Sequence, residues 1–279
     1  MIMHDKYKIT SNCNINNSDL DKSLETISNK KESVLDKNYG RCNIYKKDNN
    51  HIFTHKYNPK LSTLKQNTFE TNPNHFSTFL ELVSLFNQFI DLNSLELSRI
   101  DHAVDIPYPL DYIQARIRVK NKIKRSDYDS DKLTGFEIGR GNEIIVVYDK
   151  AYEIISKKKY RLIDKTSLGN LTRIEVRHKG PKIQHNKFLD LPKYLESNPF
   201  NKISLYEFSN SPEMSELEKR KAEYVKGNCE TWGLQHTFKS LNASNNFSKT
   251  YSKYISPSEI NKIILEDYRS KLSNFFSKE

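Results

Sequence analysis

Two short segments constrain the fold of this chain more than any other feature. The segments at 97–106, LSRIDHAVDI, and 171–180, LTRIEVRHKG, both alternate charged and apolar side chains. An alternation of period two is typical of a β-strand with one buried face. We predict that the two segments are close neighbours in one sheet and expose their charged residues on one face. These charged residues are Arg99, Asp101, Asp105, Arg173, Glu175 and Arg177.

The surrounding segments predict the remainder of an α+β fold. Hairpins are expected at 40–57 and at 136–150, the second with its turn at 140–142. Apolar residues at helical spacing predict a helix over 73–92 that packs on the sheet. After residue 181 the pattern is mainly helical. The predicted architecture is an antiparallel-rich central sheet with helices on one face and a helical C-terminal part.

The chain is predicted to have three parts. Residues 1–38 are polar and predict a partly disordered or partly helical arm. A main domain is expected over 39–255, followed by a C-terminal helix over 256–279 that packs on it. Within the main domain, the basic segment 119–132 predicts a loop. Ser211 and Pro212 are the predicted cap and first turn of a later helix.

The charge of the chain favours a polyanionic partner. Lys and Arg number 45 against 35 Asp and Glu, which gives a formal charge of +10. Nucleic acid is favoured over a membrane, and a merely soluble basic protein is the alternative. The three cysteines form no Cys-x-x-Cys motif, and no apolar run suggests a membrane span. We therefore expect a cytoplasmic protein without disulfides.

The acidic residues of the two alternating strands predict a metal site. Asp101 on one strand and Glu175 on its neighbour are expected to bind one cation, with Asp105 as a third ligand. Carboxylate oxygens suit Mg²⁺ or Mn²⁺, and these ions suit phosphate chemistry. The alternative is cross-strand ion pairing of Arg99 with Glu175 and of Arg173 with Asp101.

Three motifs in order resemble the rolling-circle plasmid replication initiators of the Rep-trans group. They are R-I-D-x-A-x-D at 99–105, V-Y-D-K-x-x-E at 147–153 and T-R-I-E-V-R at 172–177. The resemblance implies an enzyme that nicks one DNA strand at an origin with a tyrosine nucleophile and a divalent metal. It also implies that Asp101 and Glu175 hold that metal.

The nucleophile has no local motif, so the sequence leaves several tyrosines open. Tyr224 is favoured because Arg220 and Lys221 precede it by one turn of a predicted helix, where cations would hold a phosphate. The other candidates are Tyr206, Tyr160, Tyr194 and Tyr148. Lys150 is expected to contact a phosphate or assist proton transfer, or else to form an ordinary salt bridge.

The sequence thus predicts a replication initiator that nicks plasmid or mobile-element DNA. Its expected partner is a single-stranded or hairpin origin, with a helicase and a second copy of the chain as further candidates and no membrane. Three alternatives remain: a non-catalytic DNA-binding protein, a metal nuclease that uses water, and an unrelated α+β protein. The residues predicted to contact DNA are Lys120, Lys122, Lys124, Arg125, Arg173, Arg177, Arg220 and Lys221.

Overall fold

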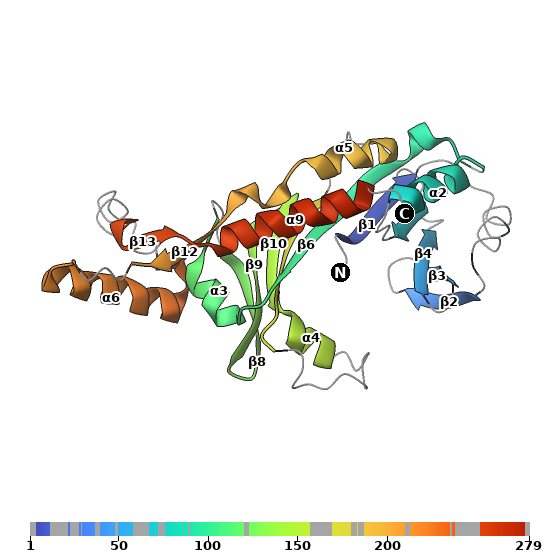
Figure 1. Cartoon of the computed structure of the whole chain (residues 1–279). Coiled ribbons are helices and arrows are strands. Elements are labelled where there is room, and N and C mark those ends of the chain that lie inside the picture. Colours follow the sequence, from blue (N-terminus) through green and yellow to red (C-terminus); the bar gives the residue numbers. More distant parts are fainter. Residues whose placement is uncertain are drawn as a thin grey trace. The chain divides into compact units, whose positions relative to one another are not determined.

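The computed structural model of the chain divides into two compact units (Figure 1). Unit 1 comprises Met1–Ala103, Arg177–Asn198 and Arg269–Glu279, and unit 2 comprises Val104–Val176 and Pro199–Tyr268. The residues that the structure describes are 4–11, 22, 28, 30–36, 40–47, 50–57, 67–71, 76–88, 90–119, 123–156, 169–179, 183, 187–209, 213–234, 236–237 and 252–276.

Unit 1 is built on an antiparallel sheet with the strand order β2-β3-β4-β5-β1-β6. The strands are β1 (His4–Ser11), β2 (Lys30–Asp36), β3 (Gly40–Lys47), β4 (Asn50–Tyr57), β5 (Asn67–Thr71) and β6 (Glu96–Ile106), of which unit 1 holds the part up to Ala103. The predicted hairpin at 40–57 is confirmed, because β3 and β4 pair up to Lys47 and Asn50.

The prediction of a polar arm over 1–38 was wrong for its described segments. β1 lies between β5 and β6 and pairs with both of them. Its Ile9 is fully buried, while Thr10 and Ser11 are nearly so. β2 pairs with β3 along its whole length. The polar composition suggested disorder, but backbone hydrogen bonds to neighbouring strands stabilise these segments. Only a few buried apolar side chains are then needed to form a strand.

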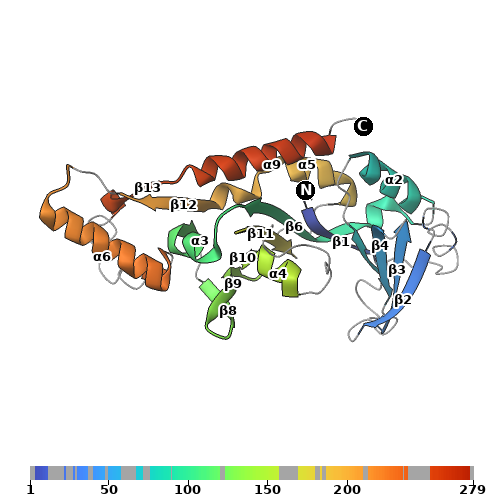
Figure 2. The same ribbon diagram turned by 60° about the horizontal axis from the view of Figure 1, so that its bottom comes forward.

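Helix α2 (Phe76–Phe86) confirms the helix predicted over 73–92, although it ends earlier. In Figure 2 it lies over one face of the strands of unit 1. The ring of Phe86 packs edge-on against Phe69 of β5, with centroids 5.1 Å apart, and also contacts Phe188. Aromatic pairs of this kind add about 0.5–1.5 kcal/mol beyond the area they bury.

Short helical elements complete unit 1. They are η1 (Leu92–Ser94), η4 (Phe188–Asp190) and α5 (Leu191–Glu196). The backbone N–H of Phe188 donates to the carbonyl of Leu95, so the segment with η4 is tied to the start of β6. Phe188 and Leu191 are fully buried as a result. The helical pattern predicted after residue 181 is therefore correct for this segment.

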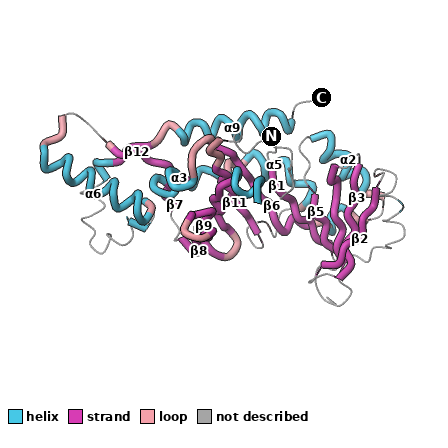
Figure 3. The backbone as a smooth tube through the Cα atoms, turned by 90° about the horizontal axis from the view of Figure 1, so that it is seen from below, coloured by secondary structure: helices cyan, strands magenta, loops and turns pink. Residues whose placement is uncertain are grey.

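Unit 2 contains a second set of antiparallel strands. β8 (Ile123–Asp129), β9 (Lys132–Arg140), β10 (Glu143–Asp149) and β11 (Thr172–Lys179, in unit 2 up to Val176) lie side by side in the order β11-β10-β9-β8. A separate sheet has the order β13-β12-β7, formed by β7 (Ile117–Val119), β12 (Ile203–Phe208) and β13 (Ile255–Pro257). Figure 3 shows these strands in magenta.

Two loop predictions had different outcomes. The turn at 140–142 is confirmed, since Arg140 pairs with Glu143 and Gly141 has a φ of 70° that favours glycine. The loop predicted over 119–132 was wrong for most of its length. Ile123–Asp129 forms β8, which pairs with β9. A strand at the edge of a sheet needs few apolar residues. The alternating charges of this segment therefore gave no sign of a strand.

The helices of unit 2 are α3 (Leu110–Arg116), α4 (Lys150–Ser156), α6 (Glu216–Trp232) and the first part of α9 (Ile260–Phe276). Unit 2 also contains two short 3₁₀ turns, η5 (Pro199–Lys202) before β12 and η7 (Ser252–Tyr254) before β13. α6 does not begin at Ser211 and Pro212, which lie outside the described residues. Ser215 caps it instead, in a reciprocal capping box with Glu218.

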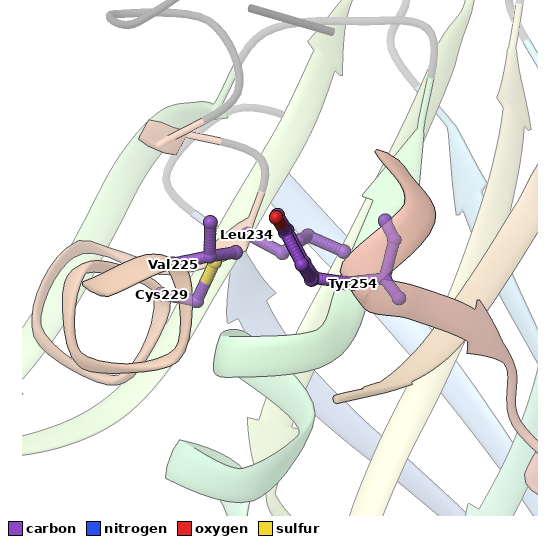
Figure 4. Packing of buried hydrophobic residues seen from close by; sticks show 5 residues of the cluster. Val225, Cys229, Leu234 and Tyr254 are labelled. Carbon is purple, nitrogen blue, oxygen red and sulfur yellow. The ribbon is translucent and has the colours of Figure 1, made fainter. Parts of the chain in front are cut away.

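A buried apolar cluster fixes α6 to its neighbours in unit 2 (Figure 4). It consists of Val225, Cys229, Leu234, Tyr254 and Ile255. Burial raises the pKa of the Cys229 thiol to about 11, so this cysteine packs as an apolar group and is not a reactive thiolate. The side chain of Cys42 is also buried.

The α+β class predicted from the sequence is confirmed, with a large antiparallel sheet and a C-terminal helix. The helix expected over 256–279 begins at Ile260. Among the described residues, no helix has both the length and the apolar character needed to cross a membrane.

Candidate functional site

The charged residues of β6 and β11 are more buried than the sequence predicted. Asp101 and Glu175 are each 2 % exposed. The expectation that both would stand on an open face was therefore wrong. Most positions of both strands are buried, the charged ones included. A buried carboxylate requires partners, and the structure supplies them within each unit.

In unit 1, Asp101 is held by arginines. The guanidinium of Arg99, two residues earlier on the same strand, forms a fork with it, and its Nε lies 2.7 Å from Oδ1 and 3.0 Å from Oδ2. Arg177 adds a longer ion pair, with Nε 3.8 Å from Oδ2. The alternative of ion pairing is thus correct in kind for this residue, but the partners differ from those predicted. Residues i and i+2 share a face of the strand, which allows the Arg99 pair.

In unit 2, Asp105 and Arg173 form a buried ion pair. Arg173 Nε lies 2.6 Å from Asp105 Oδ1 and Nη2 lies 2.8 Å from Oδ2. Both side chains are less than a tenth exposed. Such two-pronged pairs are the strongest that arginine and a carboxylate form. Arg173, predicted to contact DNA, is therefore engaged inside the unit.

The other acidic residue of unit 2 contacts a tyrosine. The hydroxyl of Tyr148, on β10, donates to Oε1 of Glu175 on β11 over 2.6 Å. Lys150 lies beside them, with Nζ 5.7 Å from the centroid of the Tyr148 ring and 2.5 Å from Glu153 Oε2. We call Tyr148, Lys150, Glu153 and Glu175 the Tyr148 site. Three of its four members come from the V-Y-D-K-x-x-E motif.

The pairing of strands explains how the Tyr148 site forms. β10 and β11 are neighbours, and Tyr148 ends the apolar run of β10. Tyr148 and Lys150 are half-buried, whereas Glu175 is buried. A hydroxyl within hydrogen-bond distance of a carboxylate is the arrangement of a nucleophile with its base. The sequence favoured Tyr224 and left Tyr148 among the other candidates, because no local pattern indicates that Tyr148 lies beside Glu175.

Unit 2 also holds a cavity of about 470 Å³, which is lined by Asp149 and Ala151 but by none of the four residues of the Tyr148 site. It is bordered by α4, by the starts of α3 and β9 and by the segment 169–172. Asp149 lines this cavity. Its carboxylate accepts hydrogen bonds from the backbone N–H of Tyr152 and from the Lys132 ammonium. These contacts give Asp149 the role of a helix cap.

The described residues do not form a ready-made metal site. No group of three or more His, Cys, Asp or Glu side chains among them is placed to hold a metal ion. Asp101 and Asp105 would each have to release an arginine to bind a cation. The metal role of these two residues and of Glu175 remains a prediction, and we assign no chemical step to a metal.

The predicted nucleophile Tyr224 lies away from the Tyr148 site. It is half exposed on α6, with Arg220 exposed and Lys221 half-buried one turn earlier. Figures 1 and 2 both show α3 between α6 and the strands β9 and β10. The structure therefore brings Tyr148, and not Tyr224, to Glu175.

The remaining tyrosine candidates have other neighbours. Tyr206 packs against the apolar cluster of unit 2. Tyr194, in unit 1, hydrogen-bonds His178 and stacks on His102, with ring centroids 5.8 Å apart. Tyr160 lies outside the described residues.

The basic stretch at 120–125 is described in part. Lys120 and Lys122 lie outside the described residues, and Lys124 lies in β8. Arg125 is exposed and pairs with Asp127, with Nε 2.5 Å from Oδ1. Contact of this stretch with DNA remains a prediction.

Sequence reasoning missed a polar cluster around Glu207 in unit 2. Tyr112, Arg116 and Ser258 all donate to this carboxylate, over distances of 2.6 to 3.1 Å. Burial acts to raise the pKa of Glu207, but the three hydrogen bonds outweigh it and lower the pKa below the ordinary value. The donors come from α3 and from Ser258, which lies between β13 and α9, so the cluster ties these segments to β12.

We expect Glu207→Gln to destabilise unit 2 by about 1 kcal/mol at pH 7. The variant loses the carboxylate charge that strengthens the three hydrogen bonds, and solvent screens part of this effect. Since folding lowers the pKa of Glu207, its charge stabilises above the ordinary value of 4.5 and this contribution is lost as the pH falls through the folded-state pKa. The free energies of unfolding of parent and variant, measured in urea, should therefore differ at pH 7 and converge as the pH falls well below 4.5. Glu259→Gln, at an exposed pair with Lys262, is the control. A difference that does not change with pH contradicts this role.

Neither the scan against models of protein families nor the search of curated proteins finds a match to this chain.

Proposed function

We propose that this protein nicks one strand of DNA by tyrosine transesterification, as an initiator of plasmid or mobile-element replication in the cytoplasm. The observation that carries the proposal is the 2.6 Å hydrogen bond from Tyr148 to Glu175, with Lys150 beside the ring. The formal charge of +10 and the resemblance of three motifs to replication initiators also support it. The comparisons with known proteins neither add to this support nor oppose it.

The reaction follows from the chemistry of the Tyr148 site. Glu175 accepts the phenol proton, and Tyr148 Oη forms a bond to the phosphorus of a DNA phosphodiester. The bond from phosphorus to the 3′ oxygen breaks, and that oxygen takes a proton from water. Lys150 is the nearby cation that offsets the phosphate charge. The products are a phosphotyrosine link to the 5′ side and a free 3′-hydroxyl that can prime synthesis.

The proposal is tested by incubating the protein with supercoiled DNA that carries its origin, with and without Mg²⁺ or Mn²⁺. We expect an open-circular product and a denaturant-resistant complex of protein and DNA. Cleavage without such a complex would favour a nuclease that uses water. Failure without added metal, together with activity when metal is present, would support the predicted metal role.

A non-catalytic DNA-binding protein is the second candidate. The ion pair of Asp105 with Arg173 and the burial of Glu175 favour it, because buried pairs of this kind are common in purely structural sites. This candidate predicts salt-dependent DNA binding without any nicked product.

A further inference from the structure

We infer that the solvent-facing side of α6 is a docking surface for single-stranded DNA. The inference rests on the proposed function for its DNA partner, but not on nicking. The surface is defined by Leu217, Arg220, Lys221, Tyr224 and Trp232, and we call it the α6 outer face. At 100° per residue these side chains fall within an arc of about 120°.

Large apolar side chains are unusually exposed on the α6 outer face. Leu217 is 62 % exposed, Tyr224 52 % and Trp232 60 %. The side of the helix that adjoins the outer face next to Trp232 carries Val225 and Cys229, which are fully buried in the apolar cluster of unit 2. The helix therefore has its core contacts already, and a second, exposed set of aromatic side chains indicates a partner.

Charge is segregated around α6. The acidic residues Glu216, Glu223 and Glu230 recur every seventh position and so share one stripe beside the outer face. Two of them pair with lysines, Glu216 with Lys219 and Glu230 with Lys226. The outer face itself holds two cations and no acid, and within the described part of the chain neither Arg220 nor Lys221 is held in an ion pair.

This combination suits unpaired DNA better than a duplex or a protein. The cations complement phosphates, and the rings of Tyr224 and Trp232 offer surfaces on which bases stack. Bases expose their faces only where they are unpaired. The two aromatic residues are eight positions apart, so they lie about 12 Å apart along the helix axis. A short run of nucleotides can therefore contact both rings and both cations.

Trp232 provides a direct test, because it is the single tryptophan of the chain. We expect the tryptophan emission to fall on titration with a 20-nucleotide oligo-dT at low salt, and acrylamide to quench the bound protein less than the free one. A duplex of equal length should change the emission much less. An emission unchanged by bound oligo-dT would overturn the inference, and an equal effect of the duplex would overturn the choice of unpaired DNA.

Two matched double variants distinguish binding at the α6 outer face from general electrostatic attraction to the helix. Arg220→Ala with Lys221→Ala should weaken oligo-dT binding roughly tenfold or more and reduce the slope of log affinity against log salt by about 1.4. Lys219→Ala with Lys226→Ala removes the same charge from the same helix but from another side. It should change affinity less than about twofold. Equal losses in the two variants would contradict a specific outer face.

The outcomes also separate this inference from the proposed nicking. Quenching of Trp232 without a covalent complex would leave the docking surface in place and refute the nicking. A covalent complex formed without any change in Trp232 emission would support the nicking and refute the docking surface. Tyr224→Ala, read by the anisotropy of labelled oligo-dT, should weaken binding about tenfold, because one stacking ring is lost. If the variant binds oligo-dT with the affinity of the parent, Tyr224 is not part of the docking surface.

Discussion

Tyr148→Phe is expected to lower formation of the covalent protein–DNA complex at least ~10³-fold, because the variant keeps the ring and deletes the attacking oxygen. DNA binding should be nearly unchanged. Glu175→Gln should also reduce the rate strongly, since an amide cannot accept the phenol proton. The measurement is the initial rate of complex formation with labelled single-stranded origin DNA on a denaturing gel.

Tyr152→Phe is the matched control for this loss. The Tyr152 hydroxyl also donates to a carboxylate, that of Asp129, over 2.6 Å, and this bond raises the pKa of Tyr152. The pair lies on an exposed part of unit 2 and should tolerate the change with full activity. Tyr224→Phe tests the nucleophile expected from the sequence. If Tyr224→Phe abolishes the complex and Tyr148→Phe does not, the assignment of Tyr148 is wrong.

Arg173→Met is expected to destabilise the protein by about 3–5 kcal/mol, because Asp105 is left buried without its cation. Both members of the pair are less than a tenth exposed, so water does not replace the arginine. Combining Arg173→Met with Asp105→Leu should recover most of the loss, since two apolar side chains then fill the space. Urea unfolding followed by circular dichroism measures all three proteins.

The control for Arg173 is Arg125→Met. Arg125 also forms a close pair with an aspartate, Asp127, but these side chains are 67 % and 40 % exposed. The expected loss is below about 1 kcal/mol. If Arg173→Met costs no more than this control, Asp105 has another partner. A gain in stability of the Arg173→Met variant on addition of Mg²⁺ would favour the predicted metal role of Asp105.

The sequence predicted those elements whose periodicity is local. Period-two alternation located β6 and β11, and the glycine turn located the β9–β10 hairpin. Helical spacing located α2 and α9. β1, β2 and β8 were not predicted, because strands rich in polar residues are stabilised by pairing with neighbours that lie far away in the sequence.

The candidate site was predicted in composition but not in its contacts. The acidic positions of β6 and β11 are brought into polar clusters, yet each carboxylate finds a partner that spacing alone does not specify. Asp101 pairs with Arg99 on its own strand, and Glu175 pairs with Tyr148 on the next one. Such choices depend on strand register and on burial of the other face, which a single sequence does not encode in any local pattern.

The most direct test of the proposed transesterification is to map the attached nucleotide. After reaction with single-stranded origin DNA, nuclease and protease digestion followed by mass spectrometry should find the remnant nucleotide on the peptide that contains Tyr148. A nucleotide on any other tyrosine would refute the Tyr148 site as the centre of the reaction. Cleaved DNA with no modified peptide would contradict tyrosine transesterification itself.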